Sequence, residues 1–224
     1  MKEVLQDSVY FGVLISLSSY IIGLWIRRKT KLSYMNPLLI AIIITICFLL
    51  ISGVSYKSYS STSSWISYLL TPATICLAVP LYQQMELLKK NSKAILFGIL
   101  SGVLSSLVSI LLLALLFSFD HNTYVTFLPK SITTAIGMGI SEELGGYVSI
   151  SVVVIIITGV LGNIFAEGVL KLLHIEEPIA KGIAIGCSSH AVGTAKAMEM
   201  GAIEGAISGL SIVVCGILTV IGAS

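Results

Sequence analysis

The stretch Ala94–Phe119, AILFGILSGVLSSLVSILLLALLFSF, decides the fold class of this 224-residue chain. It contains no charged residue and exceeds the roughly 20 apolar residues that a helix needs to cross a bilayer. The whole chain is 56% hydrophobic and 11% charged, with a mean hydropathy of +1.00, whereas soluble domains carry about 25% charged residues. The sequence therefore predicts an all-α integral membrane protein rather than a soluble enzyme.

Apolar stretches recur along the whole chain. They are Ser8–Ile26, Pro37–Val54, Trp65–Leu88, Ala94–Phe119, Tyr147–Leu173, Ile179–Met200 and Ile203–Ala223, with a short one at Ile132–Ile140. No long linker separates them, so residues 1–224 are expected to form a single polytopic membrane domain. The four cysteines, Cys47, Cys76, Cys187 and Cys215, lie within such stretches and are expected to be small core residues rather than a disulfide framework.

Basic residues between the apolar stretches predict the orientation, because cytoplasmic loops are enriched in Lys and Arg. They cluster after the first stretch, at Arg27, Arg28, Lys29 and Lys31, and after the third, at Lys89, Lys90 and Lys93. This pattern predicts a multi-pass protein of the cytoplasmic (inner) membrane with its N-terminus outside.

The short stretch Ser131–Ser141 is expected to be a re-entrant hairpin. As a helix it is too short to cross about 30 Å of hydrocarbon. A full crossing would also place the loop with Lys171, His174 and Lys181 outside, against the charge rule, whereas a segment that enters and returns places it inside. The sequence thus predicts about seven transmembrane helices plus a re-entrant hairpin.

Two of the apolar stretches are expected to be discontinuous helices. In Trp65–Leu88, Thr71 is a natural N-cap and Pro72 a natural first helical residue. In Ile179–Met200, Ser188 or Ser189 would cap a second helix start. Two interrupted segments in corresponding places of two halves indicate inverted repeats with a site at the membrane midplane. The alternative is a proline-kinked helix that only packs.

A third polar segment is Pro129-Lys130-Ser131-Ile132-Thr133-Thr134, at the expected start of the re-entrant helix. Helix N-termini carry unpaired N–H groups and a partial positive charge, which favour anions. Three such helix starts predict a site for a small carboxylate. Lys130 could instead extend to the lipid headgroups, and His190 could be a hydrogen-bonded core residue.

The expected site collects the polar residues of these three segments. The substrate-binding residues are Thr71, Pro72, Thr74, Lys130, Ser131, Thr133, Thr134, Ser188, Ser189, His190 and Thr194. His190 is also the candidate for proton coupling, because imidazole titrates near neutral pH. We expect no catalytic residue, because neighbours such as Ser189 and His190 do not face each other on a helix. No metal-ligand spacing or nucleotide signature is present, so no metal, cofactor or nucleic-acid partner is expected.

Several motifs in one order carry a resemblance that covers essentially the whole chain. They are Asn36–Leu39, Pro72–Tyr82, Pro129–Thr134, Gly137–Glu142 with Gly145 and Gly146, Thr158–Gly162, and Ser189–Ala197 followed by Glu199, Gly201, Glu204, Gly205 and Ala206. On these residues the chain resembles the LrgB/CidB family of bacterial membrane proteins. It departs from that pattern at Ala135, where proline is expected, and at Cys187-Ser188, where Thr-Ala is expected.

The resemblance implies two functions, and the two interrupted helices with the Ser188-Ser189-His190 start favour the first of them. The leading hypothesis is a transporter of small monocarboxylates such as pyruvate or glycolate, as relatives linked to pyruvate uptake and to plastid glycolate/glycerate exchange imply. The alternative is an antiholin-like regulator of murein hydrolase activity and autolysis that transports nothing. The resemblance also implies an LrgA/CidA-like holin-like partner in the bilayer. Helices rich in small residues are compatible with a homodimer.

Overall fold

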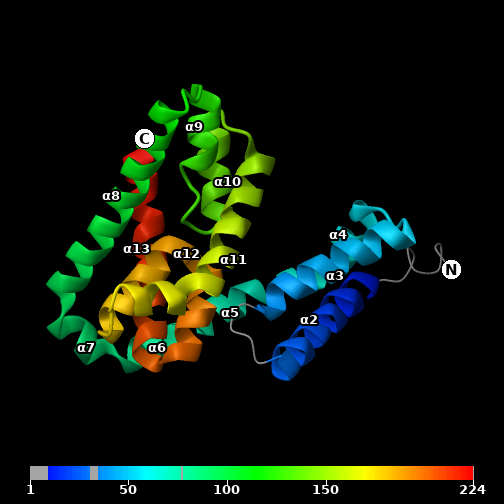
Figure 1. Ribbon diagram of the computed structural model, residues 1–224, viewed down its shortest axis with the longest axis horizontal. Coiled ribbons are helices and arrows are strands. Elements are labelled where there is room, and N and C mark those ends of the chain that lie inside the picture. The colour runs from blue at the N-terminus through cyan, green and yellow to red at the C-terminus, as the bar shows by residue number, and fades with distance from the viewer. Residues whose placement is uncertain (1–9, 31–34, 77, 224) are drawn as a thin grey trace. The chain divides into compact units, whose positions relative to one another are not determined.

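The protein is helical throughout the residues that its computed structural model describes, 10–30, 35–76 and 78–223 (Figure 1). No β-strand occurs within these ranges. The chain divides into two compact units, Met1–Cys76 and Leu77–Ser224, and each is described by itself.

Unit 1 contains α2 (Phe11–Thr30), α3 (Pro37–Ser52), α4 (Tyr56–Ser67) and α5 (Leu70–Cys76). Asn36 caps α3 by accepting from the backbone N–H of Leu38 at 2.7 Å. Thr62 of α4 accepts from the backbone N–H of Gly12 at 3.0 Å, which joins α4 to α2. The predicted break in Trp65–Leu88 is present, because α4 ends in a turn before α5 begins at Leu70.

Unit 2 alternates long apolar helices with shorter ones. Its helices are α6 (Ala78–Gln83), α7 (Met85–Lys90), α8 (Ser92–Leu116), α9 (His121–Phe127), α10 (Thr134–Glu143), α11 (Val148–Leu172), α12 (Pro178–Met200) and α13 (Ala202–Ala223). The long helices α8, α11 and α13 form the frame, and α9–α10 and α12 lie between them in the chain order.

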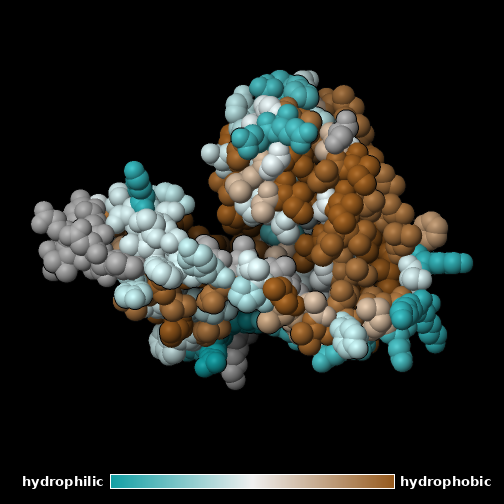
Figure 2. Space-filling model, turned by 180° about the vertical axis from the view of Figure 1, so that it is seen from behind, coloured by the Kyte–Doolittle hydropathy of each residue, from teal (hydrophilic) through white to brown (hydrophobic). Residues whose placement is uncertain are grey.

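The helices confirm the membrane class but not the expected number of crossings. In the described ranges, α2, α8, α11 and α13 are long and apolar enough to span a bilayer. Tyr56–Ile66 with Thr71–Gln83 adds a fifth if that bent pair is one span, and α3 is apolar but shorter. Figure 2 shows a broad hydrophobic surface with hydrophilic residues gathered at its ends. The predicted count of about seven is therefore not confirmed.

Helices α9 and α10 form a hairpin whose two ends meet. His121 at the start of α9 donates through Nε2 to the carbonyl O of Leu144, the residue after α10, at 3.1 Å. The turn between the helices, Leu128–Thr133, lies at the other end. There Ser131 accepts a hydrogen bond from Ser106, near the middle of α8, at 3.2 Å. The hairpin thus enters from the C-terminal end of α8 and stops halfway along it.

Helix α12 is also a hairpin, folded back at His190. This residue has φ 42° and ψ −140°, which no helix accommodates. A Cβ built on Gly193 would lie 3.3 Å from the carbonyl O of Ile185, although residues eight apart in a straight helix are separated by about 12 Å. Likewise, Lys181 and Met200, near the two ends of α12, line one cavity. In each of these two pairs, one residue precedes His190 and the other follows it at a similar distance along the chain. This is the pattern of two limbs that fold back at His190.

The predicted break in Ile179–Met200 is present at His190, next to Ser189, but the two limbs fold back on each other and do not continue in one direction as a crossing helix would. The ends of α12, near Lys181 and Met200, lie at the same end of unit 2, and its tip reaches Ile155 in the first third of α11. Because both limbs of α12 meet at one end of unit 2, α13 runs back toward the other end, and Figure 1 shows the C-terminus at the end where α8 finishes and α9 begins.

Candidate functional site

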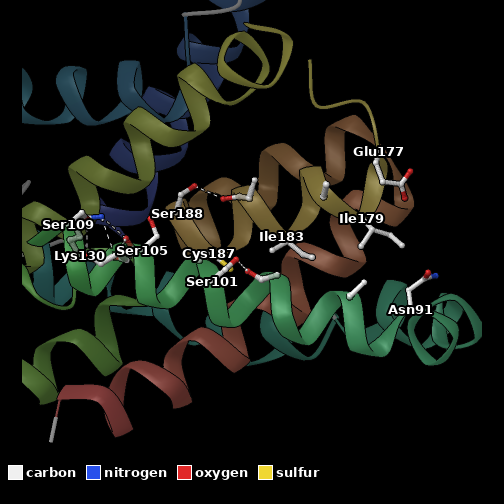
Figure 3. Close-up of a pocket in the computed structure, with 17 residues that line it drawn as sticks. Asn91, Ser101, Ser105, Ser109, Lys130, Glu177, Ile179, Ile183, Cys187 and Ser188 are labelled. Atoms are coloured by element: carbon white, nitrogen blue, oxygen red, sulfur yellow. Dashed lines mark hydrogen bonds between the residues drawn. The ribbon is translucent and has the colours of Figure 1, made fainter. Parts of the chain in front are cut away.

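The two hairpins enter unit 2 from opposite ends, and their tips contribute to one groove. The groove has a volume of about 810 Å³ and runs between α8 and the first limb of α12 (Figure 3). At one end lie Asn91 and Glu177, and at the other Lys130 and Ser131 from the α9–α10 tip. Ser188 from the α12 tip lines the same groove. The structure thus brings together two of the three segments that the sequence singled out.

Lys130 is the central polar group of the groove. Its Nζ donates to Ser131 Oγ at 2.9 Å and reaches Ser106 Oγ at 3.5 Å. Ser106 Oγ also donates to Ser131 Oγ at 3.2 Å. Within the described residues no carboxylate lies within ion-pair distance of Lys130. The ammonium group is therefore held in place by hydroxyls that do not neutralise it.

A row of serines on α8 forms one wall of the groove. These serines were not among the site residues predicted from the sequence. Ser101, Ser105 and Ser109 follow one another at intervals of one helical turn (Figure 3). Ser106, the neighbour of Ser105 in the chain, also lines the groove. Two of these hydroxyls, Ser101 and Ser109, donate to carbonyls of their own helix at 2.8 Å. Their i, i+4, i+8 spacing in an otherwise apolar helix was the signal available in the sequence.

The tip of α12 places its two serines differently. Ser188 is exposed in the groove, and its Oγ lies 2.9 Å from that of Ser189. Ser189 is buried against Gly162 of α11, where any added Cβ would overlap its side chain. Ser188 can therefore reach a ligand, whereas Ser189 orients Ser188 and packs the tip.

His190 holds the turn of the α12 hairpin. The imidazole is buried, and its Nε2 donates to the carbonyl O of Ile155 at 2.9 Å, because a carbonyl can only accept. Gly159 admits the ring, since a Cβ there would lie 2.7 Å from Nε2. His190 does not line the groove. The contact identifies it as a residue that fixes the tip, and its predicted role in proton coupling stays a prediction.

Thr194 stabilises the second limb rather than lining the groove. Its Oγ1 lies 3.1 Å from the carbonyl O of His190 and 2.7 Å from Ser208 Oγ of α13. On the same limb, Asn163 Nδ2 of α11 donates to the carbonyl O of Val192 at 2.7 Å. Lys196 pairs with Glu167 of α11 at 2.7 Å. The second limb is thus anchored to both neighbouring helices.

The remaining predicted residues lie elsewhere. Thr133 precedes α10 and Thr134 begins it, both half-buried and outside the groove lining. Thr133 makes no capping hydrogen bond through its side chain. In unit 1, Thr71 and Pro72 are exposed in the first turn of α5, so Thr71 is not the N-cap, and the side chain of Thr74 lies outside the described residues.

The donor set of the groove fits an anion. Lys130 supplies a positive charge, and serine hydroxyls supply neutral donors around it. Among the described residues, no three His, Cys, Asp or Glu side chains group as metal ligands. The chemistry that this arrangement can perform is reversible binding of a small negatively charged molecule within the depth of the helices.

An all-helical fold with several membrane-crossing helices, and with two hairpins whose polar tips line one groove, defines a polytopic membrane protein with an internal polar site. The family model described as the LrgB-like family matches residues 16–224. This chain therefore belongs to the LrgB-like family.

The relatives are similar over nearly their whole length. The holin-like protein CidB of Staphylococcus epidermidis is 37% identical over 98% of this chain and 95% of its own. The antiholin-like protein LrgB of Bacillus subtilis is 37% identical over 96% and 93%. The holin-like protein CidB of Staphylococcus aureus is 36% identical over 92% and 90%. No solved structure matches this chain.

Proposed function

We propose that this protein carries small monocarboxylates, of the size and charge of pyruvate or glycolate, across the membrane. The observation that supports this function is the Lys130 ammonium group, which faces the groove at a hairpin tip with only hydroxyl partners. A charge at membrane depth is costly unless it is compensated, and such residues mark substrate paths. A bound carboxylate would supply the missing charge.

The hydroxyls around Lys130 favour a carboxylate of small size. Ser131 Oγ accepts from both Lys130 and Ser106, so its own hydrogen can donate to a ligand. Ser188 approaches the same space from the opposite hairpin. A molecule held by donors from both tips would be released when the tips separate. This arrangement supports alternating access around a midplane site.

The position of the groove indicates which side of the membrane the site faces. It extends along α8 from Lys130 to Asn91, beside the end of unit 2 that carries Lys89, Lys90 and Lys93. The charge rule assigns this end to the cytoplasm. We therefore assign both α12 ends to the cytoplasmic side and both ends of the α9–α10 hairpin to the outside. In this assignment both hairpins are re-entrant. The α9–α10 hairpin enters from the outside and the α12 hairpin from the cytoplasm, so the two have opposite orientations within unit 2.

The test is uptake by the purified full-length chain in liposomes. Saturable uptake of radiolabelled pyruvate or glycolate is expected, and a proton uncoupler should lower it if His190 or another group couples protons. The assay is run with and without a co-reconstituted LrgA/CidA-like protein, because the family implies such a partner. Absence of uptake of any small carboxylate, with or without the partner, would contradict the proposal.

A second candidate function is regulation of murein hydrolases, and the names of the relatives favour it more directly than transport. CidB of Staphylococcus epidermidis is called holin-like, and LrgB of Bacillus subtilis antiholin-like. A regulator of this kind would act through a holin-like membrane partner or a second copy of itself. It would not need a cation in its groove.

The Lys130→Gln substitution separates the two functions. If regulation depends on carriage, the substitution weakens uptake and changes the rate of autolysis in cells that express it. If regulation is independent, autolysis is unaffected by the same substitution. Lys181→Gln is the matched control, since it removes a lysine of α12 that does not line the groove.

A further inference from the structure

Two thiols meet beneath the tip of the α12 hairpin. Cys187, in the first limb of α12, and Cys215, in α13, have their Sγ atoms 3.1 Å apart, with Cys215 donating to Cys187. Both side chains are buried and both are reduced. Cys187 is the neighbour of Ser188 and, like it, lines the groove. The pair is therefore placed between the groove and the core of unit 2.

We propose that Cys187 and Cys215 form a reversible disulfide that ties the α12 hairpin to α13 when an oxidant enters the groove. A disulfide has an S–S bond of about 2.0 Å, so the two sulfur atoms need to approach by roughly 1 Å, which side-chain rotation supplies. The two helices already pack closely beside the pair, because a Cβ on Gly186 would be only 2.7 Å from the Cβ of Ser211, one turn before Cys215. The proposal does not depend on the carrier function.

The difference in access assigns a separate step to each sulfur. Cys187 lines the groove, whereas Cys215 is only 2% exposed and does not line it. With a peroxide as oxidant, the Cys187 sulfur attacks one oxygen, the O–O bond breaks, and a sulfenic acid and water form. The Cys215 sulfur then attacks the Cys187 sulfur, so that the S–S bond forms and the S–O bond breaks. The hydroxide that leaves Cys187 takes up the Cys215 thiol proton and becomes a second water. In total the two thiols have lost two electrons, and the peroxide has accepted them.

Surroundings of Cys187 favour the disulfide over a lasting adduct on this sulfur. A Cβ built on Gly102 of α8 would lie 3.1 Å from Cys187 Sγ, so the thiol is enclosed by α8 on one side and by α13 on the other. An added oxygen or larger group would be crowded against α8. Loss of that oxygen to the neighbouring Cys215 relieves the crowding. A dithiol reductant would restore the two thiols by exchange.

The experiment uses the full-length chain in liposomes with Cys47→Ser and Cys76→Ser, which removes the exposed thiols of unit 1. After hydrogen peroxide treatment and denaturing alkylation, intact mass should show loss of two hydrogen atoms and no alkylated thiol. Proteolysis should give one peptide pair that joins residues 187 and 215. With Cys215→Ser added, no cross-link can form, and intact mass should show oxygen added to Cys187 instead.

A matched control moves the thiol by one residue. In Cys187→Ser with Ser188→Cys, the new thiol faces the groove and is turned by about 100° around the helix, so no cross-link to Cys215 is expected. Two alkylatable thiols after oxidation of the parent protein would overturn the proposal. Equal cross-linking from position 188 would also overturn it, because the disulfide would then not reflect the geometry of the pair.

Discussion

The two hairpins of unit 2 reach the same groove with turns of very different length. The α9–α10 turn is the six-residue segment Leu128–Thr133, and it presents Lys130 and Ser131 to the groove. The α12 turn is the single residue His190, which is buried and hydrogen-bonded to Ile155. A long turn can offer charged groups to a ligand, whereas a one-residue turn must be held by its neighbours. The α9–α10 tip therefore provides the positive charge of the groove, and the α12 tip provides a part of its wall that the neighbouring helices hold in place.

The largest expected effect concerns the charge on the first tip. Lys130→Gln keeps a hydrogen-bond donor but removes the ammonium group, and a hydrogen bond to a charged group contributes about 1.5–3 kcal/mol. Since 1.4 kcal/mol corresponds to tenfold in affinity, the concentration for half-maximal pyruvate uptake should rise by roughly 10- to 100-fold. Lys181→Gln should stay within about twofold. An unchanged uptake curve for Lys130→Gln would remove Lys130 from the site.

The second effect concerns the fixed wall. In Gly162→Ala the new methyl group would overlap Ser189, whose own backbone is held in the tip. We expect a loss of about 1–3 kcal/mol of stability, the usual range for overpacking, seen as a lower Tm of the detergent-solubilised protein. Gly168→Ala on the same helix is the control, because nothing lies within 4 Å of its Cβ position. Equal Tm values for both variants would show that the α12 tip does not pack on α11.

The third prediction distinguishes the contribution of the His190 side chain to stability from that of its backbone conformation. Both His190→Gly and His190→Ala lose the hydrogen bond to Ile155, but only glycine adopts φ 42° and ψ −140° without steric cost. We therefore expect His190→Gly to be about 1 kcal/mol more stable than His190→Ala in thermal unfolding. A straight helix predicts the reverse order, since alanine is the better helix former.

The smallest effect is expected at the first hairpin. Gly137→Ala meets only the terminal methyl group of Ile155 and the ring of Pro129 at close range, and the Ile155 side chain can rotate. A loss below about 1 kcal/mol is expected, measured as Tm against Gly139→Ala, which has open space. A loss at Gly137 that exceeds the loss at Gly162 would show that the α12 hairpin is not the more closely packed of the two.

The sequence predicted part of each hairpin. Ser131–Ser141 was expected to hold a whole re-entrant hairpin, but it covers only part of the turn and most of α10, and α9 supplies the other limb. The break expected at Ser188 or Ser189 lies at His190, but the two limbs of α12 do not form one crossing helix. Ser131–Ser141 is too short to cross a membrane, and this length is visible in the sequence. Pro178–Met200, in contrast, has the length of a crossing helix, and its turn rests on one residue with no proline or glycine at the break. The information lies in contacts with other helices, namely the Ile155 carbonyl and the space at Gly159 and Gly162, which local sequence cannot reveal.

The candidate site was likewise predicted in part. Lys130, Ser131 and Ser188 were chosen as polar residues at expected helix starts, and all three line the groove. Ser189, His190 and Thr194 were chosen for the same reason but pack the hairpin instead, because polarity does not distinguish a ligand from a structural hydrogen bond. The α8 serines were missed, since hydroxyls in an apolar helix are readily satisfied by their own backbone.

The central claim, that α12 enters and leaves unit 2 at the same end, is tested most directly by labelling in sealed vesicles of known orientation. Single cysteines replace Glu176 before α12, Ala202 after it, and Glu143 at the end of α10, in a background without native cysteines. A membrane-impermeant maleimide should label positions 176 and 202 from the same side and position 143 only from the other. Labelling of 176 and 202 from opposite sides would show that α12 crosses the membrane and would contradict the two-hairpin site.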